Sequence, residues 1–158
     1  MNRSMAFILL SIFAALIIAV MPLPIALEPY RPDVVLLVLV YWSLALPHRV
    51  NIVLAWIAGL IIDLALGSPL GSHSLAYSII IYVTASNYQK IRNYSVWQQA
   101  LLLSLFLALY YLMLFWINHF LLDIYFLPQY LWPVLTGALC WPWLFFLLRK
   151  YRRHFRVR

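Results

Sequence analysis

The chain has 158 residues, of which 66% are hydrophobic and 9% are charged, and its formal net charge is +7. A water-soluble domain carries about 25% charged residues, so the composition excludes a soluble globular domain and predicts a one-domain integral membrane protein. The mean hydropathy of +0.93 agrees with this class. The single cysteine, Cys140, excludes an internal disulfide, and one thiol makes no metal site.

Six apolar segments follow one another along the chain, at residues 5–23, 33–46, 50–66, 72–88, 96–117 and 129–148. Prolines, glycines and the polar stretch KIRNYS separate them. Helices are the structures that satisfy the backbone in lipid when no barrel-like alternation is present. We therefore expect an all-α polytopic protein with six transmembrane helices in residues 1–148. The first segment exceeds the roughly 7–15 residues of a signal-peptide core, so we expect it to be retained.

The distribution of charge predicts the orientation of the bundle. With the N-terminus in the cytoplasm, the inner side collects all 11 Lys and Arg residues except Arg31, as the positive-inside rule requires. Both termini are then cytoplasmic, and residues 149–158 form a basic cytoplasmic tail. The tail is expected to attract anionic lipid, or alternatively an acidic cytoplasmic protein, but not nucleic acid. The expected basic surface consists of Arg49, Arg149, Lys150, Arg152 and Arg153.

The stretch GLIIDLALGSPLG places an acid, Asp63, inside the third apolar segment. At 1.5 Å per residue it lies about 20 Å into a hydrocarbon core of about 30 Å. Gly59 and Gly67 lie four residues away on its helix face, whereas Gly71 falls past the turn. Small residues let a second backbone come close and polar residues bond across the contact, so Asp63 is expected to face protein.

Asp63 also lies near the C-terminal end of its helix, where the helix dipole disfavours a negative charge. It therefore needs a cation, hydrogen-bond donors or a proton. We expect Arg31, the start of the fourth helix at residues 72–74 with Ser72 first, or both, to hold it. Such a group is either a clamp that fixes helix packing or a site for a partner or ligand, since ionisable residues in membranes are functional candidates.

Few other groups carry chemistry. Pro32 and Asp33 read as the first turn of the second helix, and Asp33 could approach Asp63 from there. No nucleotide motif or metal-ligand spacing occurs in the sequence, so no metal, cofactor or catalytic residue is expected. An intramembrane enzyme is an alternative that requires a second catalytic group within reach of Asp63 or Ser72.

Four segments together resemble the MreD family of bacterial rod-shape-determining membrane proteins. They are RPDVVLLVLVYWSLALPHRVN, GLIIDLALGSPLG, NYSVWQQALLL and WPWLFFLLRKYRRHF. The combination of LPHRVN with the pattern GLxxDxxxGxxxG carries most of the specificity, whereas the first helix adds little.

The resemblance implies a non-enzymatic inner-membrane scaffold of the cell-elongation complex, which supports peptidoglycan synthesis and rod shape. It implies binding to MreC, a single-span protein with a large periplasmic part. Through MreC it implies links to the MreB filament, RodZ, RodA and a class-B penicillin-binding protein. It also implies a six-helix bundle similar to the substrate-binding S-components of vitamin transporters. A small-molecule-binding or transporter subunit is therefore the alternative, and it predicts an enclosed cavity with convergent polar groups.

Overall fold

The structure, a computed structural model, describes residues 3–155. Seven α-helices and two short 3-10 helices make up its regular structure, and no strand occurs within that range. The helices are α1 (Arg3–Val20), η1 (Glu28–Tyr30), α2 (Val34–Ala45), α3 (Ile52–Leu66), α4 (Ser72–Ser86), α5 (Tyr88–Arg92), α6 (Val96–Leu122), η2 (Pro128–Leu131) and α7 (Trp132–His154). The all-α prediction is confirmed, and each of the six predicted apolar segments corresponds to one long helix.

Two helical segments, Val96–Leu122 and Pro128–His154, are long and apolar enough to cross a membrane. The 27 residues of α6 extend over about 40 Å at 1.5 Å per residue. Helices α1 and α3 are apolar but shorter. Six membrane crossings therefore remain a prediction.

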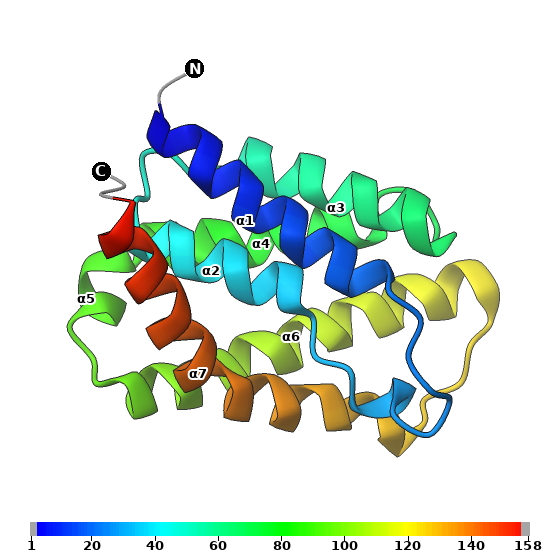
Figure 1. The fold of residues 1–158 in the computed structure, drawn as a ribbon. Coiled ribbons are helices and arrows are strands. Elements are labelled where there is room, and N and C mark those ends of the chain that lie inside the picture. Colours follow the sequence, from blue (N-terminus) through cyan, green and yellow to red (C-terminus); the bar gives the residue numbers. More distant parts are fainter. Residues whose placement is uncertain (1–2, 156–158) are drawn as a thin grey trace.

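The long helices run back and forth along one axis (Figure 1). Both ends of the described chain and the short helix α5 lie at one end of the molecule, and the α1–α2, α3–α4 and α6–α7 connections lie at the other. Helix α2 occupies the centre, since every residue from Val35 to Leu44 is buried. Helices α3 and α4 form a closely packed hairpin, and α7 packs along α6.

Local sequence explains where several helices begin. The Asn51 side chain accepts a hydrogen bond from the Leu54 N–H at 3.1 Å and starts α3. Ser95 and Gln98 form a reciprocal capping box at the start of α6. The Asp33 side chain caps α2 by accepting from the Leu36 N–H at 3.0 Å, so the capping role predicted for this acid is confirmed.

Helix α7 changes direction part-way along its length (Figure 1), as expected from Pro142 inside it. It continues to His154. The basic residues at 149–153 therefore lie on the last turns of this helix, whereas Arg156 and Arg158 lie outside the described residues.

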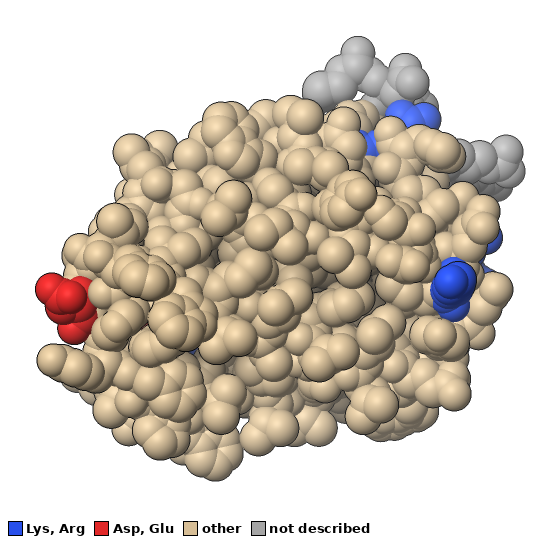
Figure 2. All heavy atoms as spheres, turned by 180° about the vertical axis from the view of Figure 1, so that it is seen from behind, with Lys and Arg blue, Asp and Glu red and all other residues tan. Residues whose placement is uncertain are grey.

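Charged side chains gather at the two ends of the molecule. Figure 2 shows acidic groups at one end, Lys and Arg at the other, and an uncharged band between them. Large apolar side chains are exposed on the long helices, among them Leu64, Leu101 and Trp143 at 70%, 77% and 82%. A contiguous apolar surface of this kind suits lipid rather than water, which places the protein in a membrane.

Candidate functional site

Asp63 is the centre of a polar cluster at the end of the α3–α4 hairpin. Its side chain is 0% exposed, as expected for an acid that faces protein. Oδ1 accepts from the Ser68 hydroxyl at 2.9 Å, the His73 N–H at 3.0 Å and His73 Nδ1 at 2.7 Å. Oδ2 accepts from the Gly71 N–H at 2.9 Å and the Ser74 hydroxyl at 3.3 Å. The carboxylate is therefore fully satisfied by the turn and the first residues of α4.

The hairpin sequence builds this arrangement locally. Gly67 has a left-handed φ of +66° and ends α3, and Gly71 has a φ of +98° and precedes α4. Glycine adopts such values without steric cost. The chain reverses within residues 67–71, so the free N–H groups at the start of α4 point back at the end of α3. The predicted support from the fourth helix is thus present, through His73 and Ser74.

Ser72 has a different role from the one expected. Its hydroxyl donates to the carbonyl of Pro69 at 2.8 Å, so it closes the turn and does not contact Asp63. Ser68, which the sequence reasoning missed, supplies the hydroxyl instead. The sequence does carry a sign of this role. Ser68 directly follows Gly67, which ends α3, so its side chain lies beside the last turn of that helix.

The prediction that Arg31 is the counter-ion of Asp63 is wrong. The Arg31 guanidinium lies 3.8 Å from the Glu28 carboxylate and donates to the carbonyl of Ile18. Among residues 3–155 it forms no ion pair with Asp63. The physical reason is local: Glu28 is three residues away in the same α1–α2 connection, whereas Asp63 is already enclosed by donors of its own hairpin.

Gly59 brings α3 and α4 of the chain itself together, whereas Gly67 and Gly71 border open space. A Cβ atom added to Gly59 would lie 2.4 Å from the Cα of Ser74, so α4 fills the face that was expected to receive a partner. Gly67 and Gly71 have no neighbouring atom within 4 Å of such a Cβ, and their conformations terminate helices. Gly67 thus has a role in the turn, and a partner-docking role for its open side remains a prediction.

A second acid cluster lies beside the first. The Asp33 carboxylate accepts from the Tyr77 hydroxyl at 2.7 and 2.9 Å and from the Tyr110 hydroxyl. The two tyrosine rings stack with centroids 5.6 Å apart, and His73 contacts both. The aromatic cluster of His73, Tyr77 and Tyr110 thus connects the surroundings of Asp33 and Asp63, which the sequence reasoning expected to approach each other.

A cavity of about 170 Å³ opens beside these two clusters. Its polar lining comes from η1, the start of α2, α4 and α6, and its remaining lining is apolar. The polar residues are Glu28, Arg31, Asp33, His73, Tyr77, Tyr110 and Tyr111. Arg31 and Asp33, which were candidate site residues from the sequence, line this cavity. The tyrosines beside them were not predicted.

The cluster does not have the geometry of a serine-type relay. The Ser68 hydroxyl lies 3.3 Å from His73 Nδ1, and the Asp63 carboxylate lies 2.7 Å from the same nitrogen. A relay needs the acid and the nucleophile on opposite ring nitrogens. In the described part of the chain, no three His, Cys, Asp or Glu residues lie together as a metal site would require.

The predicted basic surface lies at the opposite end. Arg149, Lys150, Arg152 and Arg153 lie on the last turns of α7, and Arg49 lies in the α2–α3 connection. Arg92, at the end of α5, joins Arg149 and Arg152 around a second pocket. Sequence reasoning placed Arg92 on the inner side but not with the arginines of the tail.

Residues 1–151 match the family model described as rod shape-determining protein MreD. The chain belongs to the MreD family. It is also 38% identical over 152 residues to the curated rod shape-determining protein MreD of Haemophilus influenzae, a match that covers 96% of this chain and 94% of the relative. No solved structure matches the chain. Family membership supports a role in determining cell shape.

Proposed function

We propose that this chain is a non-enzymatic, multi-pass scaffold of the bacterial cell-elongation complex that binds MreC and supports peptidoglycan synthesis. Its family membership over residues 1–151 is the observation that carries the proposal. The exposed apolar band between the charged ends (Figure 2) supports it, because the protein meets its surroundings largely through side chains suited to helices and lipid. In this proposal six helices form an S-component-like bundle in the inner membrane with both termini cytoplasmic.

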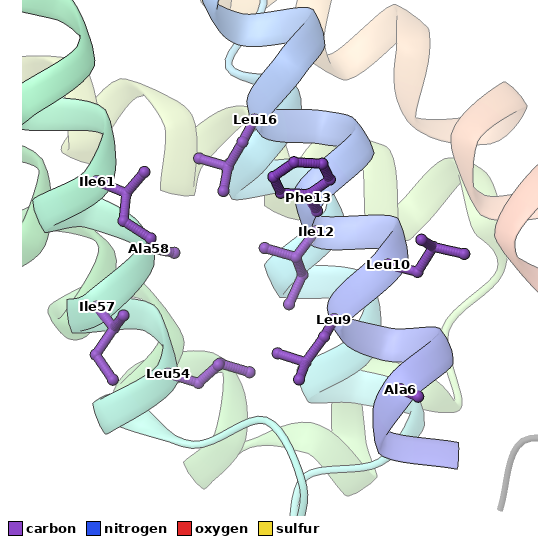
Figure 3. Close-up of a pocket in the computed structure, with 10 residues that line it drawn as sticks. All are labelled: Ala6, Leu9, Leu10, Ile12, Phe13, Leu16, Leu54, Ile57, Ala58 and Ile61. Atoms are coloured by element: carbon purple, nitrogen blue, oxygen red, sulfur yellow. The ribbon is translucent and has the colours of Figure 1, made fainter. Parts of the chain in front are cut away.

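A groove between α1 and α3 is the surface that we propose for the transmembrane helix of MreC. Its volume is about 400 Å³. Figure 3 shows side chains of α1 and α3 pointing toward each other across the gap, among them Ile12 and Leu16 opposite Ala58 and Ile61. Every lining residue is apolar. In lipid, helices associate through close packing, so a groove offers a partner helix more contact than a convex surface.

Co-purification from detergent tests the scaffold role. The tagged chain and MreC are produced together, extracted in a mild detergent and isolated through the tag on the chain. We expect MreC in the eluate. Absence of MreC in several mild detergents, with the chain itself recovered intact, would contradict the proposal.

Two variants of α3 test the groove separately. Ile61 lines the groove and is 44% exposed, whereas Leu64 is 70% exposed and does not line it. Ile61→Trp fills the groove and is expected to lower MreC recovery several-fold, and Leu64→Trp is the matched control. Equal MreC recovery with both variants would exclude the groove as the MreC-binding surface, and the scaffold role would still stand.

The wider connections follow through MreC. We propose that the MreB filament, RodZ, RodA and a class-B penicillin-binding protein associate with this chain directly or through MreC. Cross-linking in cells with and without MreC distinguishes the two routes, because a direct contact survives the removal of MreC.

The cavity beside Asp33 favours a second candidate function, the binding of a small molecule. Convergent polar groups around a concave site are typical of ligand sites, and here Asp33, His73 and Tyr110 line an open cavity together. Native mass spectrometry of the protein isolated from its own membrane tests this candidate. A retained small molecule that Tyr110→Phe releases would support it, and a mass equal to that of the bare chain would contradict it.

A further inference from the structure

A second polar pocket lies at the basic end of the molecule, between α2, α5, α6 and α7. Its volume is about 220 Å³, room for roughly seven water molecules. Three arginines line it: Arg92 at the end of α5, and Arg149 and Arg152 on α7. Tyr41 from α2 and Gln99 from α6 also line it.

Both of these buried side chains present an unused polar atom. Tyr41 is 3% exposed and Gln99 is 4% exposed. The Tyr41 hydroxyl and Gln99 Oε1 find no hydrogen-bond partner among residues 3–155. The Gln99 amide is oriented, because its Nε2 donates to the carbonyls of Ile91 and Tyr94 at 3.2 and 3.3 Å. Burying polar atoms without partners costs free energy, so a ligand in the pocket that reached either atom would offset this cost.

The arginines also lack an acidic partner. The chain has only four acidic side chains, and the structure places all of them away from this pocket. Glu28 pairs with Arg31, Asp63 lies in the hairpin with His73, Asp33 starts α2, and Asp123 ends α6. An anion is thus the group that this charge distribution would attract.

We propose that this pocket binds the phosphate group of an anionic lipid in the leaflet at the basic end of the molecule. Guanidinium groups bind phosphate oxygens through paired N–H donors, and the Tyr41 hydroxyl provides a further donor. Gln99 Oε1 can only accept a hydrogen bond, so it selects a hydroxyl next to the phosphate. The set of donors and acceptors therefore suits a phosphoglycerol headgroup.

The position of the pocket favours a lipid over a free phosphate ion. Leu44, Ala45 and Phe145 complete its lining, and it lies where the charged end meets the apolar band. A free phosphate would use the arginines and leave this apolar wall uncovered. A lipid covers both, with its headgroup on the arginines and its glycerol backbone and acyl chains along the wall. This inference is independent of MreC binding.

Native mass spectrometry of the full-length protein in detergent tests the proposal. The protein is titrated with phosphatidylglycerol, phosphatidylcholine and inorganic phosphate in separate arms. We expect one phosphatidylglycerol per chain, bound more tightly than either alternative. Arg152→Gln removes a charge-assisted contact and is expected to weaken binding by about tenfold or more. Tyr41→Phe removes one hydroxyl and is expected to weaken it by roughly threefold.

Lys150→Gln is the matched control. It removes the same charge from the same helix, but Lys150 does not line the pocket, so a change of less than about threefold is expected because exposed charges are screened. Arg92→Gln repeats the test from a different helix, in case Arg152→Gln disturbs α7. If Lys150→Gln and Arg152→Gln weakened phosphatidylglycerol binding equally, the lipid would be held by diffuse charge attraction, and the proposal of a specific pocket would be overturned. Inorganic phosphate that binds as tightly as the lipid would overturn the lipid assignment.

Discussion

The two ends of the molecule use buried polar groups in opposite ways. At the end opposite the termini, Asp63 receives five hydrogen bonds from its own hairpin, and Asp33 receives those of two tyrosines. At the basic end, Tyr41 and Gln99 each leave a polar atom unused beside three arginines. A satisfied cluster stabilises one conformation, whereas an unsatisfied one has the charge and the atoms to hold a ligand. The hydrogen bonds of the first end are thus assigned to structural support, whether or not the cavity beside Asp33 holds a small molecule, and the pocket of the second end is assigned to lipid binding.

The largest effect on stability is expected from removing the Asp63 carboxylate. Asp63→Ala leaves five donors, one buried and four partly buried, without an acceptor, and we expect the free energy of unfolding to fall by about 3–5 kcal/mol. Reversible unfolding in mixed detergent micelles measures this. Glu28→Ala is the control, because it removes a partly exposed acid whose ion pair contributes less than about 1 kcal/mol. Similar losses in both variants would contradict the structural role of Asp63.

A smaller loss is expected from crowding the hairpin. In Gly59→Ala the new methyl group meets the backbone of Ser74 at 2.4 Å, and we expect a loss of about 3 kcal/mol. Gly137→Ala is the matched control, since its methyl meets the end of the Leu107 side chain at 2.6 Å, which can rotate away. Thermal unfolding followed by circular dichroism compares the two. If Gly137→Ala were as destabilised as Gly59→Ala, the loss could not be attributed to the close approach of the α3 and α4 backbones.

Removing one hydroxyl from the Asp33 cluster sharpens the comparison. Tyr77→Phe deletes a donor to a carboxylate, and we expect it to lower the free energy of unfolding by roughly 1.5 kcal/mol. Tyr82→Phe makes the same change on α4 at a side chain that is 60% exposed, where no measurable loss is expected. The same micelle titration measures both, and equal stability of the two variants would argue against a supporting role for the Asp33 cluster.

The smallest effect on stability is expected at the basic end. Arg152→Gln breaks no ion pair within residues 3–155, so in lipid-free detergent the unfolding free energy should change by less than about 0.5 kcal/mol. A fall in the unfolding free energy of more than about 2 kcal/mol in lipid-free micelles would indicate that the arginine pocket, like the hydrogen bonds around Asp63, supports the fold.

The sequence predicted the helices well because lipid imposes a length and a composition on them. It missed α5. The five residues of this helix, YQKIR, are too few and too polar for a search that looks for long apolar segments. It also predicted the donors at the start of α4, since a turn of a few residues leaves little choice of neighbours.

Contacts between distant segments were beyond the sequence pattern. Tyr77 and Tyr110 meet Asp33 across 44 and 77 residues, and no periodicity specifies that pairing. The same holds for Tyr41 and Gln99, which line one pocket only because α2, α5, α6 and α7 meet there. Arg31 was one of the alternatives for holding Asp63, because the predicted topology leaves no other Lys or Arg on the outer side. It pairs instead with Glu28, three residues away in the chain.

The increase in melting temperature on adding phosphatidylglycerol tests the division between the two ends most directly. It is measured for the unmodified chain, Tyr77→Phe and Arg152→Gln. We expect Tyr77→Phe to melt lower than the unmodified chain with and without lipid while keeping the full increase. Arg152→Gln should melt like the unmodified chain without lipid and lose most of the increase. An increase that disappears in Tyr77→Phe but persists in Arg152→Gln would contradict the assignment of support to one end and lipid binding to the other.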